Sequence, residues 1–204
     1  MTERLTMSQV STTTSSPRRR VAMTWVVWIT AVIAYGFAVM QRTSLGVMGL
    51  TAAAHFNAPA SVVATFMVLQ LAVYAVLQIP AGITVDRLGS RVVITAGSIV
   101  MTVGQVVMAL TGSVGGAVLA RVLVGCGDAF IFGAAIRLVP AWFPPKQTPL
   151  VTQLTGLLGQ FGQVVSAVGL VAMVNSSGWR STYLLAAGGA AVAAALAFLL
   201  IRDA

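Results

Sequence analysis

Among the charged residues inside the long apolar stretches of this 204-residue sequence, three are the most informative: Arg42, Arg121 and Asp128. At the centre of a membrane-spanning helix a charge costs about 2.5–3.5 kcal/mol on insertion scales, so such a residue faces a partner or a water-filled cavity. Arg121 and Asp128 are two helical turns apart, which places them on one face but separates them by about 10 Å along the helix axis. That separation is long for a direct ion pair, so Arg42 is the candidate cross-helix partner of Asp128.

Two interpretations of these charges remain open. In the first, they form an ion-paired latch inside a helix bundle. In the second, they line a solute or proton site, and two arginines there favour an anionic solute such as a carboxylate. Glutamines and tyrosines at helical spacing on the neighbouring apolar runs either complete this cavity or form hydrogen bonds between helices. The candidate cavity residues are Tyr35, Arg42, Gln70, Tyr74, Arg121, Asp128, Gln160 and Gln163.

The composition identifies the elements that carry these residues. Hydrophobic residues make up 58% of the sequence and charged residues 8%, whereas soluble domains carry roughly 25% charged residues. A helix needs about 20 mostly apolar residues to cross a bilayer. The fold class is therefore an all-α membrane protein with six transmembrane helices, expected over residues 21–45, 61–83, 92–110, 114–139, 150–174 and 182–201.

Residues 1–20 precede these runs. They are rich in Ser and Thr, end in a basic cluster and show no apolar periodicity, so they are predicted to form a disordered cytoplasmic tail. A cleaved signal peptide is disfavoured, because the apolar run that follows is longer than a signal core and further runs come after it.

Basic residues gather on one side of the predicted bundle. That side carries Arg4, Arg18, Arg19, Arg20, Arg87, Arg91, Lys146 and Arg202, and the other side carries Arg180. Cytoplasmic loops are enriched in Lys and Arg, so we expect both termini in the cytoplasm and the chain as a multi-pass protein of the plasma membrane. The net charge of +8 thus reports orientation in a lipid bilayer and not binding to nucleic acid.

Residues 82–91 form a short charged stretch, Gly-Ile-Thr-Val-Asp-Arg-Leu-Gly-Ser-Arg, between the second and third runs. A connecting loop this brief makes the two flanking helices antiparallel neighbours. The stretch resembles the signature loop of the major facilitator superfamily, Gly-x-Leu-Ala-Asp-Arg-x-Gly-Arg-Arg/Lys. Thr84 replaces a leucine of that pattern and Ser90 replaces a basic residue. The matching residues are Gly82, Asp86, Arg87, Gly89 and Arg91.

A second match lies on the fourth run, where Gly125-Cys126-Gly127 follows four residues after Arg121. This spacing resembles the fourth-helix pattern of the same superfamily. The Gly-Pro pattern of its drug antiporters is missing from the fifth run, where Gly159 is followed by Gln160, which argues against that subgroup.

The resemblance covers residues 21–201 and implies one half of a transporter. Residues 21–204 would be the N-terminal type of half, built as two inverted three-helix repeats, with the C-terminal half absent and solute bound near the midplane between halves. The implied function is secondary active transport of a small solute by alternating access, with a proton as coupling ion and without a cofactor or metal.

The five matching residues of the charged stretch would form the cytoplasmic gate. Asp86 and Arg91 would make the pairs that hold it shut, while Gly82 allows close helix approach and Gly89 a tight turn. Arg137, near the cytoplasmic end of the fourth run, is expected to snorkel or to brace this stretch. The alternative is a surface turn whose charges only set orientation.

Two other function classes remain to be weighed. The first is a six-helix membrane module that does not transport by itself, either an accessory subunit or a unit that pairs with a second six-helix half or with another copy. The second is a membrane enzyme, which is disfavoured because His-Glu-x-x-His, Gly-x-Ser-x-Gly and paired catalytic carboxylates are absent from the sequence.

Overall fold

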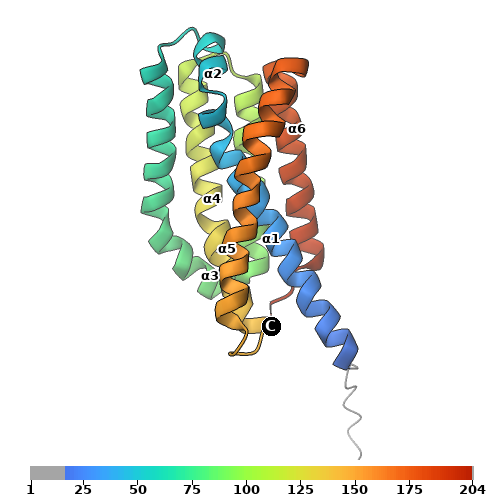
Figure 1. The fold of residues 1–204 in the computed structure, drawn as a ribbon. Coiled ribbons are helices and arrows are strands. Elements are labelled where there is room, and N and C mark those ends of the chain that lie inside the picture. Colours follow the sequence, from blue (N-terminus) through green and yellow to red (C-terminus); the bar gives the residue numbers. More distant parts are fainter. Residues whose placement is uncertain (1–16, 204) are drawn as a thin grey trace, which may run out of the picture.

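The computed structural model describes residues 17–203, which form a bundle of long helices with no strand in that range (Figure 1). Residues 1–16, most of the predicted tail, lie outside the described residues, and the first helix begins at Pro17. The helices are α1 (Pro17–Val47), α2 (Gly49–His55), α3 (Ala60–Leu110), α4 (Val114–Trp142), α5 (Thr148–Val165), the π-helical turn η1 (Ser166–Leu170) and α6 (Val171–Leu200).

Two of these helices fold back on themselves. Drawn straight, the 51 residues of α3 would extend about 75 Å, more than twice the thickness of a bilayer core. Instead α3 reverses at Gly89 (φ 79°, ψ 162°), and α6 reverses at Gly178 (φ 78°, ψ 174°). Both are left-handed φ values that favour glycine. Figure 1 shows the α3 reversal at one end of the bundle and the α6 reversal at the other.

The reversals are shorter than the sequence predicts. Residues 84–88 and 175–177 were expected in loops but are helical, because a single glycine with positive φ turns the chain. The fourth helix also continues past its predicted end at residue 139, through Pro140 to Trp142. A proline in the last turn sacrifices one helical hydrogen bond only.

Four stretches of residues 17–203 are long and apolar enough to cross a membrane. They are Val21–Val47, Ala60–Leu110, Val114–Trp142 and Thr148–Leu200. The second and fourth contain the reversals at Gly89 and Gly178. The chain is therefore a multi-pass membrane protein.

Small residues bring the helices together. Lipid tails remove the hydrophobic force between helices, so close backbone packing takes its place. A Cβ on Gly97 of α3 would lie 2.8 Å from the carbonyl oxygen of Gly127 on α4, and one on Gly125 would lie 2.6 Å from that of Gln70. Side chains at these positions would force α3 and α4 apart.

The fifth run packs in the same way against α1. Gly159 lies against the Tyr35 ring and Gly162 against the backbone of Gly36, whereas nothing lies within 4 Å of a Cβ placed on Gly156. Two of these three glycines therefore let α5 approach α1 closely.

Candidate solute site and charged turn

Arg42 on α1 and Asp128 on α4 form an ion pair across the bundle, with 3.2 Å between Nη1 and Oδ2. This is the cross-helix pair that the sequence suggests. The Asp128 side chain is fully buried, whereas 19% of the Arg42 side chain is exposed. The second Asp128 oxygen, Oδ1, has no hydrogen-bond partner among residues 17–203. The pair thus leaves one buried carboxylate oxygen without a partner and part of the Arg42 side chain exposed.

Tyrosines frame this pair. The Arg42 guanidinium lies 5.5 Å from the centre of the Tyr74 ring, within cation–π range. Tyr35 lies two helical turns before Arg42 on the same face of α1 and is buried, with its ring 4.8 Å from that of Phe132 on α4 and against Gly159 on α5. Tyr74 therefore contacts the Arg42 guanidinium, while Tyr35 packs against α4 and α5.

A cavity of about 330 Å³ opens beside Arg42, between α1, α3 and α5. Thr43, Gln70 and Gln163 contribute its other polar side chains, and Met67, Val47 and Leu71 contribute apolar walls. This volume is at the lower end of ligand pockets and fits a small organic solute. Gln160 is exposed and does not line the cavity.

Arg121 lies apart from this cavity, although the sequence groups it with Arg42. Its side chain is fully buried, and its Nη1 and Nη2 atoms donate at 3.4–3.5 Å to uncharged oxygens. These acceptors are the Gln41 carbonyl oxygen, Ser44 Oγ, Gln70 Oε1 and Gln105 Oε1. Sequence analysis missed Gln41, Ser44 and Gln105. A lone glutamine in the middle of an apolar run is the signal that could have identified Gln105.

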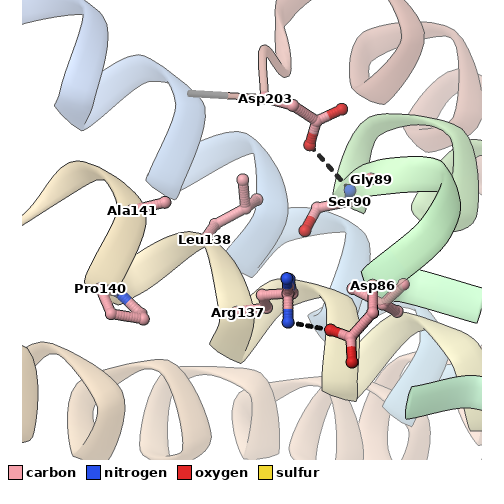
Figure 2. Close-up of a pocket in the computed structure, with 9 residues that line it drawn as sticks. Asp86, Gly89, Ser90, Arg137, Leu138, Pro140, Ala141 and Asp203 are labelled. Atoms are coloured by element: carbon pink, nitrogen blue, oxygen red, sulfur yellow. Dashed lines mark hydrogen bonds and ion pairs between the residues drawn. The ribbon is translucent and has the colours of Figure 1, made fainter. Parts of the chain in front are cut away.

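The charged turn lies where α3 reverses, and its main ion pair joins Asp86 to Arg137 of α4 (Figure 2). Arg137 therefore braces the charged stretch, one of the two roles expected for it. Arg91 turns to α6 instead: its Nε donates to the Phe198 carbonyl oxygen at 2.7 Å, and its guanidinium lies 4.6 Å from the Phe198 ring. Arg87 is exposed.

Gly82 has open space around it, with no atom within 4 Å of a Cβ placed there. Within the described range, therefore, no neighbouring helix makes the close approach that was expected at Gly82. Gly89, in contrast, carries the reversal, as expected from its place in the stretch.

Asp203, at the far end of the chain, completes the turn. Its Oδ1 accepts hydrogen bonds from the backbone amides of Ser90 at 2.7 Å and Arg91 at 3.3 Å, as Figure 2 shows for Ser90. A carboxylate at this position caps the second limb of α3 and complements the positive end of its dipole. Asp86, Arg137 and Asp203 face a common cavity of about 480 Å³.

Comparison with known proteins identifies the class. The family model of the Major Facilitator Superfamily matches residues 26–204, and the chain belongs to this superfamily. It is therefore a membrane protein of a transport family, not of an enzyme family.

Particular relatives are named for acidic solutes. A protein of Escherichia coli K12 named "Probable L-galactonate transporter" is 24% identical over 159 residues, covering 78% of this chain and 34% of that protein. The "Hexuronate transporter" of the same organism is 25% identical over 56% of this chain and 26% of its own length. A "Probable sulfoacetate transporter" of Cupriavidus necator is 26% identical over 55% of this chain and 26% of its length. The chain thus spans about a third or less of these relatives.

A solved structure shares the fold. The bacterial homologue of the human lysosomal transporter Spinster, in its inward-facing and occupied conformation, superposes with a TM-score of 0.77. The identity is 18%, and the match covers 93% of this chain and 46% of that one. This similarity concerns the fold alone.

Proposed function

We propose that this chain forms one half of a secondary active transporter that moves a small organic anion by alternating access, with Arg42 binding the anionic group. The observation that carries the proposal is the Arg42–Asp128 pair at the edge of a polar cavity. The names of the three relatives above, for galactonate, hexuronate and sulfoacetate, support a carboxylate or sulfonate as the solute.

The two glycine reversals support an arrangement of six membrane crossings in two inverted repeats. In this arrangement each repeat has three helices, and Gly89 and Gly178 both follow the second helix of their repeat. The reversals lie at opposite ends of the bundle (Figure 1), as inversion requires. A second six-helix half, or another copy of this chain, would close the cavity from the other side.

The ion pair suggests how transport could be coupled to a proton. Asp128 holds Arg42 through one oxygen while its other oxygen has no partner in the described chain. A proton on Asp128 would remove its charge and free the guanidinium for the solute anion. Proton and anion would then bind together and leave together, with both termini on the cytoplasmic side of the plasma membrane.

Arg42→Gln in the complete transporter that contains this half tests the proposal. We expect uptake of labelled glucuronate, galactonate or sulfoacetate, driven by an inward proton gradient in proteoliposomes, to fall at least tenfold. Arg180→Gln is the matched control, because Arg180 is exposed and lies two residues after the Gly178 reversal of α6. Unchanged uptake in Arg42→Gln would remove Arg42 from the solute site. This half reconstituted as a monomer should accumulate no solute.

A further inference from the structure

We propose that Gln70 and Arg121 form a buried brace that sets the rotation of α1 and so aims Arg42 at Asp128, with Arg121 acting through α1 and not on the solute. The brace is inferred from the hydrogen bonds that join the three helices. Its importance for transport rests on the proposed function, in which Arg42 binds the solute.

Arg121 donates hydrogen bonds to α1 at a residue before Arg42 and at a residue after it. Its Nη1 donates to the Gln41 carbonyl oxygen, one residue before Arg42, and both terminal nitrogens donate to Ser44 Oγ, two residues after it. The Gln41 carbonyl oxygen also accepts from Ser44 Oγ at 2.7 Å, so the 3.4 Å bond from Arg121 is an additional, longer contact to an oxygen that Ser44 shares.

Gln70 connects Arg121 to the backbone of Arg42 itself. Its Oε1 accepts from Arg121 Nη1 at 3.4 Å, and its Nε2 donates to the Arg42 carbonyl oxygen at 3.3 Å. One amide from α3 therefore joins the guanidinium from α4 to the backbone of α1. The three helices meet at the residue from which the Arg42 side chain departs.

Burial separates the Arg121 guanidinium from the cavity, whereas Gln70 also lines the cavity wall. Arg121 and Ser44 are 0% exposed, Gln41 is 1% and Gln70 is 2% exposed. A solute that reaches Arg42 therefore does not reach the Arg121 guanidinium in this conformation. A buried guanidinium that loses its acceptors is left uncompensated, so Arg121 resists any movement of α1 that would break these bonds.

The Arg42–Asp128 contact needs this restraint. Its 3.2 Å separation is already longer than the 2.7–2.9 Å typical of such charged hydrogen bonds. A binding group must be held within roughly 0.5 Å and 10–20° of its working geometry. A small rotation of α1 would therefore break the pair and move Arg42 out of line with the cavity.

The test uses Gln70→Leu, which removes both amide hydrogen bonds at similar side-chain size. The chain in detergent micelles is treated with phenylglyoxal, and the modification rate of each arginine is followed by mass spectrometry. We expect Arg42 to be modified at least threefold faster in Gln70→Leu than in the wild type, while Arg180 keeps its rate. Equal Arg42 rates in Gln70→Leu and the wild type would overturn the brace.

Ile94→Ala is the matched control. Ile94 is also on α3 and 0% exposed, and it lies in a hydrophobic cluster that contains no brace residue. It should lower the melting temperature while leaving the Arg42 rate unchanged. An equal rise in the Arg42 rate in Ile94→Ala would mean general loosening and would overturn the proposal. If Gln70→Leu does not fold, Ser44→Ala removes two of the Arg121 contacts with a smaller expected rise.

Glucuronate separates this inference from the proposed function. We expect it to protect Arg42 of the complete transporter from phenylglyoxal and to leave Arg121 unmodified throughout. Ser44→Ala, at a brace residue that does not line the cavity, should raise the KM for glucuronate several-fold with a maximal rate within about twofold. If Arg121 is modified as fast as Arg42, the brace is wrong. If glucuronate does not protect Arg42 but Gln70→Leu still exposes it, the brace stands and the solute assignment falls.

Discussion

The molecule contains two arginine–aspartate pairs in opposite environments. Arg42–Asp128 lies inside the bundle with the carboxylate fully buried, whereas the side chains of Asp86 and Arg137 are 58% and 53% exposed at the charged turn. The same two functional groups therefore have different energetics. Breaking a buried pair leaves an uncompensated charge and costs about 3–5 kcal/mol, while an exposed pair contributes about 0–1 kcal/mol.

The two regions also achieve order by different means. Around the buried pair, α1, α3 and α4 are joined by side-chain amides and a guanidinium. At the charged turn the order comes from the backbone: a glycine with positive φ and a carboxylate that caps the following helix. Charge neutralisation therefore stabilises the region around the buried pair, whereas backbone conformation stabilises the charged turn.

The largest effect is expected when the buried pair is broken from one side. Arg42→Leu leaves the Asp128 carboxylate buried without its partner, and we expect the free energy of unfolding in micelles to fall by about 3 kcal/mol. The double substitution Arg42→Leu with Asp128→Leu should recover most of this loss, since neither charge then remains. A double variant that is less stable than the single one would contradict the assignment of the cost to the unpaired charge.

The two reversals provide the next comparison. Gly89→Ala forces a side chain into a positive φ, which costs about 1–2 kcal/mol, and its Cβ would also lie 2.8 Å from Asp203 Cγ. Gly178→Ala meets the same backbone strain but has no atom within 4 Å of the new Cβ. We expect both variants to lose stability in urea unfolding, with the larger loss in Gly89→Ala. Equal losses would show that the contact with Asp203 adds nothing.

Loss of the cap should have a smaller effect. Asp203→Ala removes the acceptor for the Ser90 and Arg91 amides, and removal of a capping side chain typically costs about 1 kcal/mol. Hydrogen exchange of these two amides should accelerate, while exchange in α4 stays unchanged. Asp203→Asn is the informative companion, because it keeps an oxygen acceptor and should retain most of the protection.

The family and the Arg42–Asp128 pair can be predicted from the sequence, but the neighbours of each polar residue cannot. Arg42, Asp128 and the Gly89 turn follow from the cost of a buried charge and from the conformational freedom of glycine. The placement of Arg121 does not, because helical spacing gives a face and a height but not which helix packs there. The Asp203 cap joins residues 113 positions apart, and no local pattern indicates it. Gly82 shows the converse: it matches the motif, yet nothing in the described chain packs against it.

The smallest effect on stability is expected at the exposed pair. Asp86→Asn removes its charge, and we expect the free energy of unfolding to change by less than about 1 kcal/mol. The change should shrink further between 0.05 and 0.5 M salt, because added ions screen exposed charges whereas the buried Arg42–Asp128 pair is shielded from them. Urea unfolding of Asp86→Asn and Arg42→Leu at both salt concentrations measures this contrast directly. If Asp86→Asn cost as much as Arg42→Leu at both salt concentrations, the pair at the turn would be a structural lock and the distinction between the two regions would fail.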